Sequence, residues 1–208
     1  MRGSAASPGC ARALLAAILL SNGAALSAQV SDEFLEAFSA ELDADEPALE
    51  LKKGGPVTHV EAAIVINAPS SAIWGVLVAC DVAPEYVPNV VDCQSIEVLN
   101  DGAAELFIQT VKAALWVTFE HVFRMDYEPH ARIIISRVSG PIRRLEATWE
   151  LVPRADRSVL LTYSLAVDPG IPIPRWFVRQ TLKRDLPKVL EAVRQRSMAP
   201  AAQAREVR

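Results

Sequence analysis

Histidine and cysteine are scarce in this chain, with three of each among 208 residues. The histidines, His59, His121 and His130, are widely spaced in sequence, and no cysteine pair has histidines near it at the spacing that a zinc site uses. The sequence therefore predicts no metal site, and no motif in it indicates a bound cofactor.

An excess of positive charge is also absent, because 21 basic residues face 25 acidic ones and the formal net charge is −4. Such a balance argues against nucleic acid as a partner. Long apolar runs are missing as well. The run Ala13–Leu20 is shorter than the roughly 18 residues that a transmembrane helix needs, and no other stretch approaches that length.

The N-terminus has the order of segments that is typical of a secretory signal peptide. Arg2 and Arg12 precede the apolar run, and the small residues of Gly23–Ala28 follow it. This order predicts a signal peptide over residues 1–28 and a periplasmic or secreted mature protein. An uncleaved N-terminal anchor is the alternative. Cleavage would remove two arginines and no acid, which moves the net charge to −6.

Two cysteines, Cys80 and Cys93, lie outside the predicted signal peptide. An even pair in an exported protein favours a disulfide. Closing so short a loop would stabilise the fold by about 3 kcal/mol in the chain-entropy model. The alternative is that both are small buried residues with free thiols.

The segment after the predicted signal peptide is strongly acidic, since residues 29–50 hold eight acids and no base. Residues 31–42 carry apolar side chains at helical spacing, and residues 43–56 have the glycines and charges of a linker. We therefore expect an acidic N-terminal arm and linker over residues 29–56, a compact domain over 57–197 and a disordered tail over 198–208.

Seven segments of the compact domain show the alternation of apolar and polar residues that is typical of β-strands. They are Val57–Asn67, Val91–Leu99, Glu105–Ala113, Leu115–Tyr127, Arg132–Val138, Arg143–Val152 and Ser158–Val167. Two short helical segments separate the first strand from the second. Short turns join most of the later strands, so these are expected to be antiparallel neighbours.

A long amphipathic helix is expected to begin at Pro174 and to run past Val193. It is the one element long enough to cover the apolar face of a seven-stranded sheet. The sequence thus predicts an α+β fold in which an antiparallel sheet curls around the C-terminal helix.

These elements resemble the START-like (SRPBCC) superfamily, in its polyketide cyclase/dehydrase and coenzyme-Q-binding branch. The resemblance covers about residues 57–197. It is carried by the helix start Ala68–Trp74, by the turn from Asp81 to Val90 with Tyr86-Val87-Pro88-Asn89 within it, and by the terminal helix. The resemblance implies a helix-grip fold and a cavity between sheet and helix that receives a hydrophobic molecule. It implies no shared catalytic motif.

His121 is the candidate for chemistry, because it lies on the apolar face of its strand between Phe119 and Phe123. A histidine there could act on a ligand as acid or base, or could be a structural residue, since no acid or serine is spaced to orient it. The predicted ligand-binding residues are Phe119, His121, Phe123, Met125, Trp149, Tyr163, Val178 and Leu182.

Three hypotheses for function follow. The first is a carrier outside the cytoplasm for a lipid, isoprenoid or quinone, whose basic helix face contacts anionic membranes transiently. The second is a cyclase- or dehydratase-type enzyme that uses His121. The third is a protein-interaction module that docks through the acidic arm or the basic helix.

Overall fold

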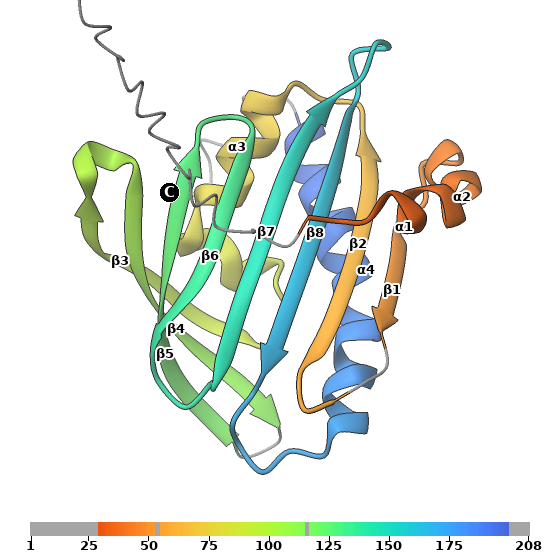
Figure 1. The fold of residues 1–208 in the computed structure, drawn as a ribbon. Coiled ribbons are helices and arrows are strands. Elements are labelled where there is room, and N and C mark those ends of the chain that lie inside the picture. The colour runs from red at the N-terminus through yellow and green to blue at the C-terminus, as the bar shows by residue number, and fades with distance from the viewer. Residues whose placement is uncertain (1–28, 53–54, 115–116, 200–208) are drawn as a thin grey trace, which may run out of the picture.

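Residues 29–52, 55–114 and 117–199 are described by the computed structural model of the protein (Figure 1). The predicted signal peptide and residues 200–208 of the predicted tail lie outside these ranges.

The described residues form one antiparallel sheet with the strand order β1-β2-β8-β7-β6-β5-β4-β3. Consecutive strands from β3 to β8 are neighbours, as the short turns predict, and β8 returns to pair with β2. The strands are β1 (Ala48–Lys52), β2 (Thr58–Ile66), β3 (Val90–Leu99), β4 (Ala104–Ala114), β5 (Val117–Glu128), β6 (Arg132–Ser139), β7 (Arg144–Pro153) and β8 (Val159–Asp168).

Two helices cover one face of this sheet, and the two N-terminal helices pack on the other face near the β1 edge. They are α1 (Asp32–Ala37), α2 (Ser39–Asp43), α3 (Ser70–Val78) and α4 (Arg175–Met198), with 3₁₀ turns η1 (Cys80–Glu85) and η2 (Asn100–Gly102). In Figure 1, α3 and α4 lie behind the sheet, and α1 and α2 lie at its β1 edge. The predicted α+β helix-grip fold is confirmed.

The predicted count of seven strands is wrong, because the described sheet has eight. The additional strand, β1, falls inside the predicted linker and pairs with β2 from Ala48 opposite Ala63 to Lys52 opposite His59. It is short and carries charges at alternate positions, as edge strands often do. That composition is hard to distinguish from a linker, so the linker prediction fails over these residues.

The N-terminal arm packs on the outer face of the sheet, opposite α4. Phe34 and Leu42 are buried against Ala63 and Val65 of β2, which point away from the main core. Glu61 holds the start of α1, since its carboxylate accepts hydrogen bonds from the Ser31 amide at 3.2 Å and the Ser31 hydroxyl at 3.0 Å. The arm is thus attached both by the burial of its apolar side chains and by these hydrogen bonds to Glu61.

The main core lies between the inner face of the sheet and α4. Along β2 the inward residues Val60, Ala62, Ile64 and Ile66 are at most 1% exposed. They belong to the same apolar cluster as the buried α4 residues Leu186, Val189, Leu190 and Val193, which recur at helical spacing. This packing fixes the C-terminal half of α4 against the β2 side of the sheet.

We predict that Phe34→Ala lowers the free energy of unfolding by about 3 kcal/mol, because it opens a cavity under α1. Leu35→Ala, at a half-buried neighbouring position, is the matched control and should cost clearly less. Urea unfolding of both variants measures the difference. Equal, small losses for the two variants would show that the arm does not dock on the sheet.

Candidate ligand-binding site

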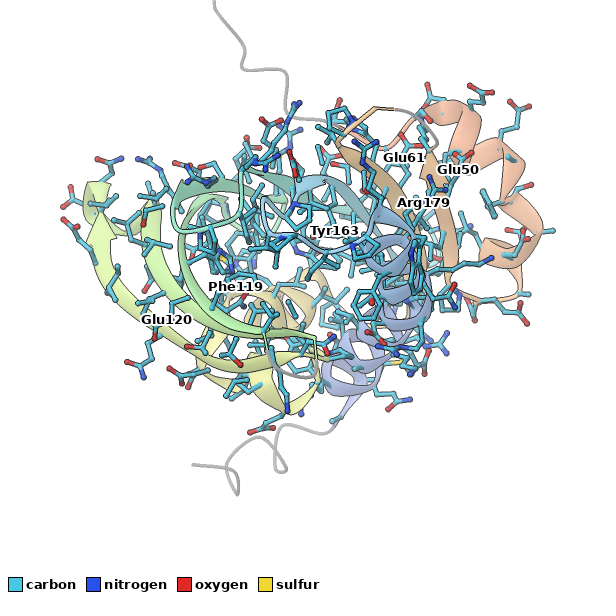
Figure 2. All side chains as sticks on the ribbon, turned by 90° about the horizontal axis from the view of Figure 1, so that it is seen from below. Glu50, Glu61, Phe119, Glu120, Tyr163 and Arg179 are labelled. Carbon is cyan, nitrogen blue, oxygen red and sulfur yellow. A yellow bond between two sulfur atoms is a disulfide. The ribbon has the colours of Figure 1, made fainter. Side chains whose placement is uncertain are left out.

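A cavity of about 380 Å³ lies between the inner face of the sheet and α4. Its wall is mainly aromatic and aliphatic. Figure 2 shows Phe119 and Tyr163 inside the curve of the sheet, whereas Glu120, the neighbour of Phe119, points outward. The volume lies within the roughly 300–1,000 Å³ that is usual for small-molecule sites.

Strand alternation supplies the sheet side of the wall. On β5, Phe119, His121, Phe123 and Met125 share the inward face and line the cavity. On β7 and β8, Trp149 and Tyr163 are register partners whose rings stack with centroids 4.1 Å apart. Aromatic rings from β5 and from β7 and β8 thus line the cavity on the inner face of the curled sheet.

The helix side of the wall comes from the middle of α4 and extends to Val189 and Val193 in its second half. Thr181, Leu182, Asp185 and Leu186 line the cavity. Leu190, one turn beyond Leu186, is fully buried in the main core and is not part of the wall. The cavity therefore borders the main core, because Leu186, Val189 and Val193 belong to both.

The turn between α3 and β3 closes a third side. A disulfide joins Cys80 of η1 to Cys93 of β3, with a Cα–Cα distance of 5.4 Å. Asn89 donates a hydrogen bond to Asp185 of α4 over 3.2 Å, and the Arg196 guanidinium lies 4.8 Å from the centre of the Tyr86 ring. These contacts hold the turn against both the sheet and the helix.

His121 is the most deeply buried polar residue of the wall, with 4% of its surface exposed. Its Nε2 lies 3.0 Å from Oε1 of Gln109, which faces it across β4 and β5. Its Nδ1 has no hydrogen-bond partner among the described residues. Burial lowers the pKa of His121 from 6.5 to about 4, so the ring is neutral at physiological pH.

Gly140, in the bend that follows β6, lies close to His121. Its φ of +106° is in the region that favours glycine, and a Cβ there would lie 2.7 Å from the His121 Cβ. The backbone of Gly140 can therefore approach His121 more closely than any other residue would allow.

The two tyrosines of the wall remain protonated. Burial raises the pKa of Tyr163 well above its usual value. Burial is also the main reason that the pKa of Tyr86 rises to about 12, against the opposing effect of Arg196. Tyr86 donates to the carbonyl of Val76 at 3.1 Å.

Asp185 is the buried carboxylate of the wall, with 8% of its surface exposed. Both of its oxygens accept hydrogen bonds from Arg184 at 2.7 Å, and this contact is the main reason that its pKa is lowered. Asn89 and Lys188 add smaller effects in the same direction. Asp185 is therefore ionised, and Arg184 balances its negative charge. It can hold the turn between α3 and β3 through its hydrogen bond with Asn89.

The structure places seven of the eight predicted ligand-binding residues in the wall of this cavity. Val178 is the exception and lies in a smaller cavity of about 140 Å³, beside Arg143 and Asp168. Helical spacing correctly placed Val178 on the inward face of α4, but it could not show which of the two cavities this residue lines. Whether the seven residues bind a ligand remains a prediction.

Gln109, Asp185 and Asn89 are polar residues of the site that the predicted set did not include. Gln109 shares the inward face of β4 with Phe107 and Val111, so strand alternation could have revealed it. Asp185 interrupts the apolar stripe of α4 at the correct helical spacing, and its pairing with Asn89 depends on the tertiary fold. No sequence pattern links those two residues.

Other kinds of site are not visible in the described ranges. No group of three His, Cys, Asp or Glu residues among the described residues could hold a metal ion. No helix in residues 29–52, 55–114 or 117–199 is long and apolar enough to cross a membrane.

An antiparallel sheet that grips one long helix around an apolar cavity defines a START-like helix-grip protein. The family model described as polyketide cyclase / dehydrase and lipid transport matches residues 66–194, and the chain belongs to that family. The matched range runs from the end of β2 to near the end of α4. The coenzyme-Q-binding branch is not specifically supported. A comparison with curated protein sequences finds no match.

Solved structures share the fold at low sequence identity. A STAR-related lipid transfer protein fragment from Xanthomonas axonopodis is 20% identical, with a TM-score of 0.64, over 74% of this chain and 95% of that one. The Zhui aromatase/cyclase from Streptomyces sp. R1128 is 17% identical, with a TM-score of 0.58, over 73% and 96%. Human STARD10 is 15% identical, with a TM-score of 0.59, over 88% and 86%.

The burial of His121 predicts a pH dependence of stability. Between pH 6.5 and about pH 4, His121 binds a proton in the unfolded chain but not in the folded protein. The free energy of unfolding should therefore fall by about 3 kcal/mol across this window, and this contribution should be absent above it. His121→Phe should lack this part of the fall, whereas the exposed control His59→Phe should retain it. Urea unfolding at neutral pH and near pH 4 measures the effect, and parallel profiles for all three proteins would contradict it.

Proposed function

We propose that this protein is a carrier outside the cytoplasm that binds one hydrophobic small molecule, a lipid, an isoprenoid or a quinone, in the cavity between the sheet and α4. The observation that carries this proposal is the cavity itself, about 380 Å³ in volume and lined mainly by apolar side chains. Moving apolar surface from water into such a site is favourable by about 25 cal/mol per Å² before ordering costs.

The polar groups of the wall favour binding over catalysis. Among the described residues, Gln109 is the one side chain that forms a hydrogen bond with His121, and an amide does not increase the basicity of the ring as a carboxylate would. With its pKa lowered to about 4, His121 is also a weak base. A cyclase or dehydratase that uses His121 is therefore the less favoured candidate.

Two features of the sequence support a location outside the cytoplasm. The N-terminal residues have the charge and apolar pattern of a signal peptide. A disulfide between Cys80 and Cys93 also suits an oxidising compartment.

Native mass spectrometry of protein taken from its own compartment tests the carrier function, together with displacement of the apolar fluorophore N-phenylnaphthylamine. Ala147, which is 3% exposed and lines the cavity, is the position to change. We expect Ala147→Phe to fill the space and to weaken binding at least tenfold, while the free energy of unfolding changes by less than about 1 kcal/mol.

The matched control is Ala62→Phe. Ala62 is fully buried on the same face of the sheet but does not line the cavity, so a larger side chain there should cost roughly 3 kcal/mol by overpacking. If Ala147→Phe destabilises the protein as much as Ala62→Phe does, the space is effectively filled. The carrier proposal then fails.

Transient contact with anionic membranes is the second part of the proposal. Arg175, Arg179 and Lys183 lie on the first half of α4, which also lines the cavity through Leu182. Trp176, next to Arg175, is 69% exposed. An exposed tryptophan beside cationic side chains suits the interface of a membrane, where its ring meets the headgroup region.

We predict that vesicles containing phosphatidylglycerol retain the protein at low salt and release it at high salt, since the attraction is electrostatic. Changing Arg175, Arg179 and Lys183 to glutamine should abolish retention. Arg154→Gln with Arg157→Gln, in the turn between β7 and β8 at the opposite end of the molecule (Figure 1), is the control and should leave retention intact. Co-sedimentation measures both, and equal retention by phosphatidylcholine vesicles would contradict the prediction.

A further inference from the structure

We propose that His121 recognises a hydroxyl group of the ligand, whose O–H donates a hydrogen bond to the unpaired Nδ1 of the ring. The ligand would then be an alcohol or phenol with an apolar body. This inference rests on the proposed function and deepens it, because it assigns polar chemistry to the molecule held in the same cavity.

Two neighbouring side chains, Cys93 and Gln109, locate the proton of the His121 ring. Cys93 Sγ belongs to the disulfide and carries no hydrogen, so it can only accept. The Gln109 amide nitrogen lies 3.8 Å from that sulfur and donates to it, which turns Oε1 of Gln109 toward His121. Because Oε1 only accepts, Nε2 of His121, 3.0 Å away, must carry the ring hydrogen.

Nδ1 of His121 is therefore a lone-pair acceptor in a neutral ring. The side chain is 4% exposed, and no described residue donates a hydrogen bond to this atom. The His121 ring also contacts two aromatic rings, since the ring centroids of Phe119 and Phe123 lie 6.0 and 5.5 Å from its own. His121 lines the cavity, but Nδ1 itself is buried, so a small rotation of the ring is needed before a ligand hydroxyl can reach this atom and complete the site.

This arrangement selects between classes of hydrophobic ligand. A hydroxyl donates to Nδ1 and relieves the cost of a buried, unpaired acceptor. Ethers, ketones and oxidised quinones present only lone pairs to it, and a carboxylate adds a negative charge beside an acceptor. The site thus favours an isoprenoid or fatty alcohol over its methyl ether, and a hydroquinone over the corresponding quinone.

A matched pair of probes tests the assignment: farnesol and farnesyl methyl ether, each competed against N-phenylnaphthylamine on the full mature chain. The wild-type protein should bind farnesol about tenfold more tightly than the ether. In His121→Phe the ratio of the two affinities should fall to one or below. The control His59→Phe, which replaces an exposed histidine, should keep the wild-type ratio.

The outcomes separate this proposal from the carrier function. If the wild-type protein binds both probes equally or prefers the ether, the hydroxyl proposal is overturned and the carrier function stands. A protein that binds the fluorophore but neither isoprenoid also overturns the hydroxyl proposal. If not even the fluorophore binds, the carrier function fails, and the hydroxyl proposal fails with it.

Long-range ¹H–¹⁵N spectra of the histidine rings give a second test that needs no variant. The free protein should show His121 with its proton on Nε2, and the Nδ1 resonance should shift when farnesol is added but not when the ether is added. A proton found on Nδ1 of the free protein would overturn the assignment even if the substituted proteins do not fold.

Discussion

The width of one helix relative to the width of the sheet is the constraint on which the rest of this structure depends. A sheet of eight strands spaced about 4.8 Å apart is roughly 34 Å across, whereas a helix with its side chains is about 10–12 Å wide. The C-terminal half of α4 is occupied by its packing at the β2 side, where Leu190 and Val193 are fully buried. One helix cannot also fill the curve over β4 to β7, so aromatic side chains line an open space there.

The remaining contacts give that space its boundaries and its chemistry. The disulfide and the Asn89–Asp185 hydrogen bond hold the turn before β3 in position. Strand alternation sends Glu120 and its charged neighbours outward, so His121 and Gln109 are among the few polar side chains of an otherwise apolar wall. The N-terminal arm builds a separate small core on the outer face and contributes nothing to the cavity.

Periodicity in the sequence predicted most of this fold. Most of the predicted strands and the stripe of α4 bury mainly one face, which is what an alternating or helical pattern records, although β2 buries both faces and β3 buries little. β1 was missed because an edge strand of five residues with two charges buries little. Two helices, α1 and α2, replace the single predicted helix, with the break at Phe38.

The site was harder to predict than the fold. A pattern shows which residues face inward, but not whether they meet one another or leave a space between them. Gln109 could have been found by alternation along β4, whereas its contact with His121 depends on the register of two strands. Val178 shows the same limit, because the predicted face of the helix was correct but the residue lines a different cavity from the predicted one.

Crystallography under xenon pressure tests the central claim most directly, because xenon enters dry apolar cavities and scatters strongly. Xenon sites should appear between Phe119 and Tyr163 on the sheet and Leu182 on α4, with the side chains around them unmoved. A crystal structure in which side chains occupy that space, so that no xenon enters it, would contradict the claim that the sheet and α4 enclose room for a ligand.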